Sequence, residues 1–428
     1  MFSNLKKHIH QRVTHPVETI YLFLPIVAFF LPLDQFLLIG TICCVVIVLN
    51  VKRFTKALIF KKSYLSFVFI FYMLILADIN NNVMGMIAEG FMLLILIYMS
   101  NLRPFITKGI FETLMFIIGG GSIFSLYYCT IDFYTTSTYK LYEFFMKYIH
   151  IPYTYITQIA EGIRSASTYV DPNFYGHISA FIALISIYYI LSSLKSLFHK
   201  KWLYLFKLSF YTLILVVNIY ALYLTQSRSA FIALLVGTAV LILVFDARLF
   251  IGLSIPLVLF ISLRYDDFLG LFPRLSTAGL DLDYRLSLYK AAFEEILKNP
   301  FIGKGFYTYP LVYENYTTGY QLHTHNLFLE LWLDSGLVGL SLIAGYYLSY
   351  IKRPIKVWYR KRKEVMPLVL GVIALEVVNG LTDAVLIFPQ SFILLSIVLL
   401  SLELNDKTDP QSVINKDKNN PLESNENS

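Results

Sequence analysis

The stretch HTHNLFLELWLDSGLVGL, which runs from His323 to Leu340, begins a long apolar segment with polar residues. An imidazole can accept or donate a proton near neutral pH, which suits it to activating a hydroxyl group. A membrane-spanning helix has no need of such a group at its end. We therefore take His325 as a candidate catalytic residue with Asn326 in a supporting role, while a simple helix cap remains the alternative.

Three arginines accompany short polar motifs elsewhere in the chain. Arg164 precedes Asn173, Arg228 follows Ser227, and Arg285 opens the stretch RLSLYKAAFEEILKNP. A guanidinium group stays ionised and forms bidentate hydrogen bonds with phosphate. Arginines that hold a diphosphate leaving group beside one base would make a transferase site in which no metal is required. Each arginine taken alone also fits a side chain that reaches solvent or lipid headgroups.

The pair His323-x-His325 also suits a metal ion. A metal site needs a third ligand at suitable spacing, however, and none lies near this pair in the sequence. The cysteines, which are Cys43, Cys44 and Cys129, have no metal-ligand spacing either. We therefore expect neither a metal site nor disulfides.

The composition places these residues in a membrane protein. The chain is 57% hydrophobic and 15% charged, whereas a soluble domain is about half apolar and about one quarter charged. The net charge of +7 comes with basic residues that lie between apolar runs. That pattern indicates membrane topology and not a nucleic-acid partner.

Because a helix needs roughly 20 apolar residues to cross a bilayer, the sequence predicts an all-α polytopic protein with about twelve spans. Residues 1–404 would form a single transmembrane domain, and residues 405–428 would form a disordered cytoplasmic tail. The predicted spans are 17–33, 36–51, 64–79, 83–100, 111–129, 174–194, 203–225, 229–245, 248–263, 326–350, 366–386 and 390–404.

Lysine and arginine gather in alternate connectors, and they predict the orientation of the spans. They begin before the first span with Lys6, Lys7 and Arg12, and they include the connector KRPIKVWYRKRK after the tenth span. Positive residues in short connectors remain on the cytoplasmic side. We therefore expect both termini in the cytoplasm and the polar motifs outside it.

Two of the outer connectors are long, and they cover residues 130–173 and 264–324. Loops of this length are usually functional or disordered. The second contains a run at helical spacing, which Asp281 or Asp283 can cap and Asn299-Pro300 can end. We expect an amphipathic helix that lies on the membrane or over a cavity. Its apolar residues are Leu286, Tyr289, Phe293, Ile296 and Leu297.

Glu89 and Glu376 fall inside predicted spans. Carboxylates are costly in a bilayer and often mark function. We expect both to be paired within the bundle, although they also fit a transporter.

The order of these motifs resembles that of the O-antigen ligase/polymerase superfamily, which builds bacterial surface polysaccharides. The similar portion runs from about Asn173 to Leu340. The motifs that carry the resemblance are Thr225-Gln-Ser-Arg-Ser229; Arg285 followed by a helix and Asn299-Pro300-Phe-Ile-Gly303-Lys-Gly305; and His325-Asn326 followed, after nine residues, by Gly336-x-x-Gly339.

The resemblance implies a C-type glycosyltransferase of the bacterial cytoplasmic membrane. Such an enzyme is inverting and metal-independent, works on the outer face, and uses undecaprenyl diphosphate as the substrate carrier without a cofactor. By matched position, His325 would assist the acceptor hydroxyl. The diphosphate would be bound by Arg228, Arg285 and Arg164. Supporting positions would be Ser227, Asn326 and Asn173.

Several functions fit these motifs. A polymerase would join lipid-linked oligosaccharide repeats into a capsular, exopolysaccharide or O-antigen chain, with a flippase and a chain-length regulator as further partners. A ligase would transfer a finished glycan to lipid A core, protein or wall. The composition, rich in Lys, Asn, Ile and Tyr, hints at a low-GC bacterium and favours the polymerase. A flippase or transporter is a third function, but the charged residues gather at span ends and not along a path at mid-membrane.

Overall fold

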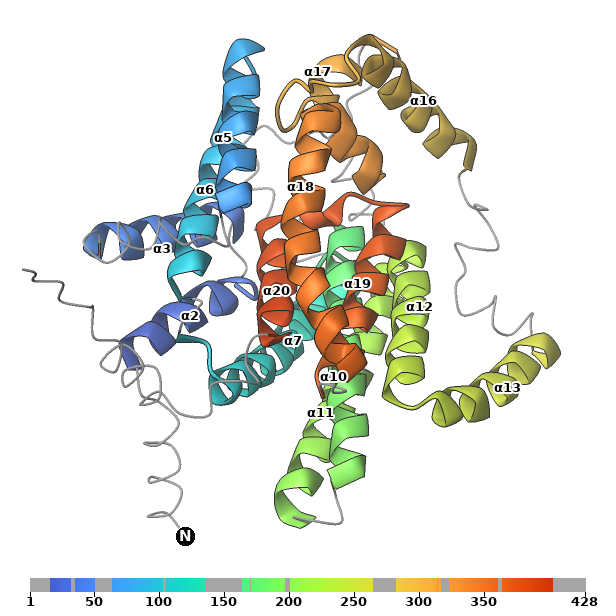
Figure 1. The fold of residues 1–428 in the computed structure, drawn as a ribbon. Coiled ribbons are helices and arrows are strands. Elements are labelled where there is room, and N and C mark those ends of the chain that lie inside the picture. The colour runs from blue at the N-terminus through green and yellow to red at the C-terminus, as the bar shows by residue number, and fades with distance from the viewer. Residues whose placement is uncertain are drawn as a thin grey trace, which may run out of the picture.

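The computed structural model describes residues 16–31, 35–50, 64–102, 105–135, 164–169, 171–196, 201–264, 282–313, 315–316, 323–360 and 364–402. Across these residues it is all-helical (Figure 1). Six helices are long and apolar enough to cross a membrane, and several shorter apolar helices accompany them. The chain is therefore a multi-pass membrane protein. The predicted tail 405–428 and most of the predicted loop 130–173 lie outside the described residues.

The helices agree with the predicted spans, each of which overlaps one of them. In chain order they are α2 (Pro16–Ala28), α3 (Gln35–Leu49), α5 (Tyr64–Ile79), α6 (Val83–Leu102), α7 (Lys108–Thr135), α10 (Pro172–Ser196), α11 (Lys201–Thr225), α12 (Arg228–Phe245), α13 (Ala247–Leu263), α16 (Leu282–Lys298), α17 (Tyr309–Tyr313), α18 (Leu327–Arg360), α19 (Met366–Gly380), the 3-10 helix η2 (Val385–Ile387) and α20 (Pro389–Leu400).

The predicted span 366–386 needs a correction, because α19 already ends at Gly380. The backbone N–H groups of Thr382 and Asp383 both turn back to the carbonyl of Asn379, at 3.0 and 2.9 Å. The chain then enters η2 before α20 begins. This turn removes Asp383 from the helix and places it at one end of the bundle.

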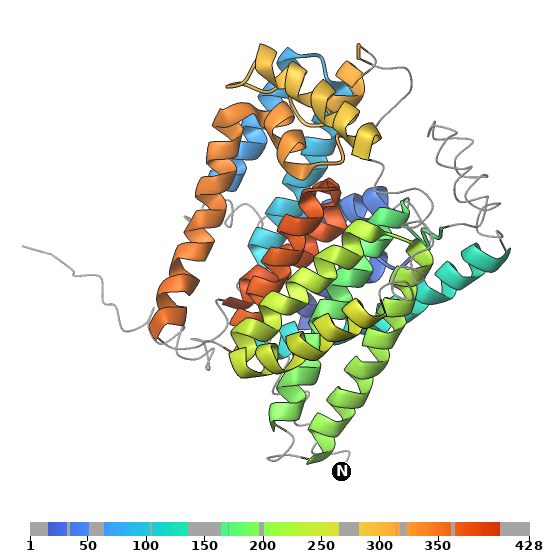
Figure 2. The same ribbon diagram turned by 90° about the vertical axis from the view of Figure 1, so that its right-hand side faces the viewer.

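The core of the bundle is built by α10, α11, α12 and α19, with α7 and α20 beside them (Figure 1). Helices α12 and α19 approach closely at Gly237 and Gly371, where a Cβ on either glycine would lie 2.9 Å from the carbonyl oxygen of the other. Small residues of this kind permit close helix contacts in membranes. Helix α18 packs on α5 at the side of the bundle, and α16 and α17 lie together at one end (Figure 2).

The glycines noted in the sequence form a joint between the loop and α18. Gly336 interrupts the helix with a φ of 62° and a ψ of −176°. Its distortion frees the N–H groups of Leu337 and Val338, which donate to the carbonyls of Pro300 and Phe301, both at 3.1 Å. A Cβ on Gly336 would lie 2.4 Å from the Phe301 oxygen.

The same joint is closed from the other side by Asp334, which is 1% exposed. Its carboxylate accepts hydrogen bonds from the backbone of Tyr307 and Thr308 at 3.3 and 3.1 Å. Its carbonyl accepts the N–H of Gly305 at 2.9 Å. Gly303 leaves no room for a side chain, because a Cβ there would lie 2.0 Å from the Asp334 oxygen. The loop motif that contains Gly303 and Gly305 and the α18 motif that contains Gly336 therefore contact each other directly.

Replacing Gly336 with alanine should destabilise the protein by about 2 kcal/mol or more, because alanine is strained at positive φ and its Cβ has no space. The measurement is the thermal midpoint of the purified protein in detergent. Gly90→Ala is the matched control, since a Cβ at Gly90 meets nothing within 4 Å. Equal midpoints for the two variants would show that the joint does not constrain the fold.

Candidate active site

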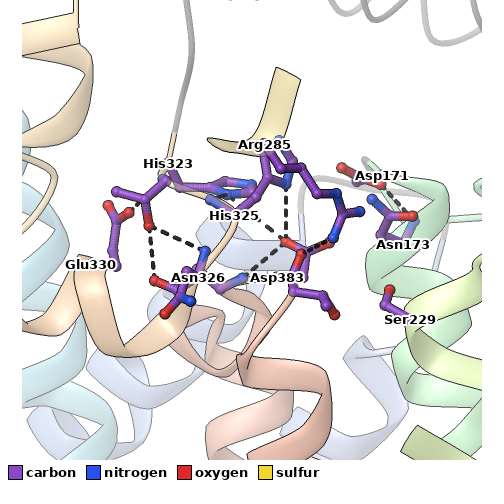
Figure 3. A network of polar contacts seen from close by, with 12 residues as sticks. Asp171, Asn173, Ser229, Arg285, His323, His325, Asn326, Glu330 and Asp383 are labelled. Atoms are coloured by element: carbon purple, nitrogen blue, oxygen red, sulfur yellow. Dashed lines mark hydrogen bonds and ion pairs between the residues drawn. The ribbon is translucent and has the colours of Figure 1, made fainter. Parts of the chain in front are cut away.

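The polar motifs come from separate parts of the chain and meet at one end of the bundle. Figure 3 draws Arg285 and His325 with Asp383, and it shows Asn173 and Ser229 beside them. They are contributed by the first turn of α16, the loop before α18, the turn after α19, and the adjoining ends of α10 and α12. The predicted base His325 and the predicted arginine Arg285 therefore both lie against the turn that follows α19.

His325 faces a carboxylate. Its Nδ1 lies 3.5 Å from Oδ1 of Asp383, and the two side chains are 19% and 2% exposed. Burial alone would raise the pKa of Asp383, but contact with His325 and the proximity of His323 outweigh burial and hold that pKa below its usual range. A carboxylate at Nδ1 fixes the orientation of an imidazole and stabilises it once protonated. The pair has the arrangement of a general base with its orienting acid.

The loop that carries His325 is strained and firmly held. His325 has a φ of 54°, which is uncommon for a residue with a side chain and is often found at functional sites. The N–H of Thr324 donates to Oε2 of Glu330 at 2.6 Å. Asn326 caps α18, since its Oδ1 accepts the N–H groups of Phe328 and Leu329 at 3.0 and 3.1 Å. Asn326 therefore supports the site by starting the helix that follows it.

Tyr289 and Asn326 connect this loop to the turn after α19. The hydroxyl of Tyr289 lies 3.2 Å from the carbonyl oxygens of both His325 and Leu381. The Nδ2 group of Asn326 donates to the same Leu381 oxygen at 3.2 Å. Arg285, one helical turn before Tyr289, donates from Nη1 to the carbonyl of Thr382 at 2.9 Å. The helix α16 thus positions Arg285 against the turn that holds the carboxylate.

His323 is buried beside the same pair. Its Nδ1 accepts the N–H of His325 at 3.2 Å and lies 3.8 Å from Oδ1 of Asp383. Burial, followed by the charge of His325, lowers the pKa of His323 to about 4. His323 is therefore neutral near pH 7.

The sequence did not reveal that Asp383 could be a third metal ligand, since one of its oxygens lies within 4.8 Å of ligand atoms of His323 and His325. The site is nevertheless a poor match for a metal held through both Nδ1 atoms. The Nδ1 lone pair of His323 already accepts a backbone hydrogen bond, and a ligating nitrogen needs that lone pair.

Stability should depend on pH through His323. The unfolded chain protonates this residue near its ordinary pKa of 6.5, whereas the folded protein does so near 4. The unfolded state therefore binds more protons between these values, and stability should fall as the pH is lowered through that window. In His323→Asn the side-chain oxygen can accept the His325 N–H but does not titrate. We expect its thermal midpoint to fall less between pH 6.5 and 4 than that of the wild type; parallel curves would contradict the assignment.

The other two predicted arginines lie on the α10–α12 side of the site. Arg228 is the first residue of α12 and follows Ser227, which occupies the N-cap position and is 1% exposed. Arg164 is 7% exposed. It donates from Nε to the carbonyl of Thr225 at 2.8 Å and from Nη2 to Oδ1 of Asn173. Arg164 and Asn173 therefore hold the start of α10 against the turn that precedes Arg228.

The buried acids differ in their surroundings. Glu376 lies 3.2 Å from Nε2 of His177, and both side chains are almost fully buried between α10 and α19, as expected for a pair within the bundle. Glu89 is 3% exposed on α6. Asp383 was missed because it fell inside an apolar run, although an acidic residue in a predicted span was itself a signal. Glu330, inside the predicted span 326–350, carried the same signal, whereas Tyr289 gave none beyond helical spacing.

Comparison with known families adds an independent finding. Residues 213–344 match the family model described as Wzy_C, O-antigen ligase. A comparison with curated proteins found no match. The matched segment begins within α11 and ends within α18, so it includes Arg228, Arg285 and His325 but not Asp383.

Proposed function

We propose, from the premise that residues 213–344 belong to the Wzy_C, O-antigen ligase family, that this chain is a polysaccharide polymerase. It would join oligosaccharide repeats carried on undecaprenyl diphosphate into a capsular, exopolysaccharide or O-antigen chain. The observation that carries the proposal is the contact between His325 and Asp383 beside Arg285, at one end of a membrane bundle.

In this proposal His325 acts as the general base for the acceptor sugar. With Nδ1 directed at Asp383, Nε2 is the atom that would take the proton from the acceptor hydroxyl. The hydroxyl oxygen then bonds to the anomeric carbon of the donor from the face opposite the leaving group, which inverts that carbon. The proton remains on the imidazole, where Asp383 stabilises its charge, until it passes to the released diphosphate or to solvent.

The leaving group is the second requirement. As the bond between the anomeric carbon and the phosphate oxygen breaks, the electron pair moves to the diphosphate, and cations aimed at that oxygen lower the barrier. We assign this work to Arg285 and Arg228. Arg164 would act mainly by holding Asn173 and the turn before α12, because its guanidinium already donates to Thr225 and Asn173.

The site needs no metal under this mechanism, since guanidinium groups carry the charge of the diphosphate. The substrates would be two lipid-linked oligosaccharides, whose carrier is anchored by the bilayer itself. In this proposal a flippase that delivers repeats and a regulator of chain length are further partners.

A ligase that transfers a finished glycan to another acceptor is the second candidate, and the description of the matched family favours it. Deleting the gene and analysing the glycans that remain on the lipid carrier distinguishes the polymerase from the ligase. Loss of long polymer with retention of single repeats supports the polymerase. Free long polymer that accumulates on the carrier supports the ligase, and unchanged surface glycan would reject both.

The orientation proposed for the site can be tested by labelling. We expect a cysteine at Asn299, which is exposed just after α16, to react with an impermeant thiol reagent added outside intact cells (or spheroplasts). A cysteine at Glu364, whose side chain is 81% exposed at the opposite end, should react only after permeabilisation. Positions within the site itself, such as Ser227 and Thr324, would not serve, because they are 1% and 0% exposed and a reagent could not reach them. The reverse pattern would place the site in the cytoplasm.

A further inference from the structure

Helix α16 exposes an apolar stripe that none of the residues described by the structure covers. Leu286, Phe293 and Leu297 are 58%, 44% and 61% exposed. Their spacing of seven and four residues places them on one face of an α-helix. These are three of the residues from which an amphipathic helix was predicted, so the helix is confirmed, but this part of its apolar face stays largely exposed among the described residues.

The other faces of α16 are either packed or polar. One face carries Leu288, Ala291, Ala292 and Ile296, which pack with α17 and the start of α18. The next carries Arg285 and Tyr289, which reach the turn after α19. A third face is polar and exposed; its residues are Ser287, Lys290, Glu294 and Lys298. The apolar stripe therefore lies between the face that points to the site and the face that is charged.

The stripe continues along the chain into the surface of α18. Phe301 and Ile302, just beyond α16, are 65% and 55% exposed. The backbone of Phe301 is bonded to Val338 at 3.1 Å, and Leu337 and Val338 are 39% and 44% exposed within the candidate span Leu327–Leu348. An exposed apolar surface on a membrane span faces lipid, so the same surface extends from that span onto α16.

Trp332 marks the level at which the two parts meet. Its ring lies 6.4 Å from that of Phe293 in an edge-on arrangement, and its indole N–H donates to the carbonyl of Pro300 at 3.0 Å. Tryptophan is enriched where hydrocarbon meets headgroups. Lys290, which is 78% exposed beside the stripe, can extend its ammonium to headgroups from such a depth.

We propose that the stripe formed by Leu286, Phe293, Leu297, Phe301 and Ile302 is seated in the bilayer leaflet on the site's side of the membrane. The loop helix is then a membrane-surface helix, and its depth places Arg285 at the level of lipid phosphates. The proposal concerns lipid contact, so it holds whether the enzyme is a polymerase or a ligase.

Spin labels in lipid nanodiscs test this contact. Single cysteines at Phe293 and Leu297 would be introduced into a chain from which Cys43, Cys44 and Cys129 have been removed. The matched controls are cysteines at Ser287 and Glu294, on the polar face of the same helix. We expect the ratio of collisions with oxygen to collisions with a water-soluble nickel complex to be several-fold higher at the stripe than at the controls.

Three results would overturn the proposal. Stripe labels that are as accessible to nickel as the controls would show a helix in water. Dipolar coupling between labels in nanodiscs that hold two copies would show that a second chain covers the stripe. Protection that appears only on addition of undecaprenyl diphosphate would show that the carrier's tail occupies it.

Tryptophan fluorescence provides a second test that does not require spin labels, which could disturb the fold. A chain that retains Trp332 but carries Trp202→Phe and Trp358→Phe should lose fluorescence in lipids brominated near the headgroup. Unaltered fluorescence in those lipids would also contradict the proposal.

Discussion

Replacing His325 with alanine is expected to reduce sugar transfer by about 10²- to 10⁴-fold, the usual contribution of a positioned general base. Cells that carry this variant should accumulate single repeats on the lipid carrier and lack long polymer. The purified variant should retain its thermal midpoint to within a few degrees, because His325 is the more exposed member of its pair with Asp383. Asn315→Ala, at an exposed position of the same loop, is the control and should transfer normally.

Replacing Asp383, the carboxylate partner of His325, tests the same pair independently. Asp383→Asn keeps the shape of the side chain but loses the charge that stabilises the imidazolium. The variant should therefore be nearly as inactive as His325→Ala, and combining the two changes should add little, since residues that act as a unit are not additive. Full additivity would mean that Asp383 acts elsewhere. Normal chain growth in His325→Ala would remove the imidazole from the mechanism.

The sequence predicted the apolar helices well, because long apolar runs have few alternatives in a bilayer, although among the described residues only six of the twelve predicted spans coincide with helices long and apolar enough to cross a membrane. It also pointed to His325 and Arg285, because polar residues at the ends of such runs are conspicuous. Asp383 was not predicted as a site residue, because a turn after Gly380 cannot be distinguished from a continuing span when the flanking residues are apolar. The contact between Asp383 and His325 depends on the tertiary arrangement of α18 and α19, which no local pattern encodes.

The glycines and the loop helix show a similar limit. The positions of Gly303 and Gly336 were evident as a motif, but their reason lies in two backbones that approach one another across the joint. For α16 the apolar spacing predicted a helix, but it did not indicate which of its apolar residues would pack against the protein. The protein packs the face that contains Ala291 and Ala292, because small side chains allow a close approach to α17 and α18. Larger apolar residues such as Phe293 remain outside.

Replacing Arg285 tests the leaving-group half of the mechanism. Arg285→Ala should reduce transfer by about 10²- to 10³-fold, as expected when a group that stabilises developing negative charge is removed. The same result is expected for Arg228→Ala. Lys290→Ala is the matched control, since Lys290 is a cation on the same helix whose side chain is 78% exposed; it should transfer normally.

The variant Arg285→Lys distinguishes a role of Arg285 in binding the diphosphate from a role in holding the turn after α19. Arg285 also donates to the carbonyl of Thr382, and an alanine variant could fail only because that contact is lost. A lysine ammonium can still donate to one carbonyl but cannot form a bidentate pair with phosphate. We therefore expect Arg285→Lys to keep the thermal midpoint of the wild type while its kcat stays low. If Arg285→Lys restores transfer, the guanidinium is only a brace for the turn that carries Asp383, and the diphosphate must be held by other residues.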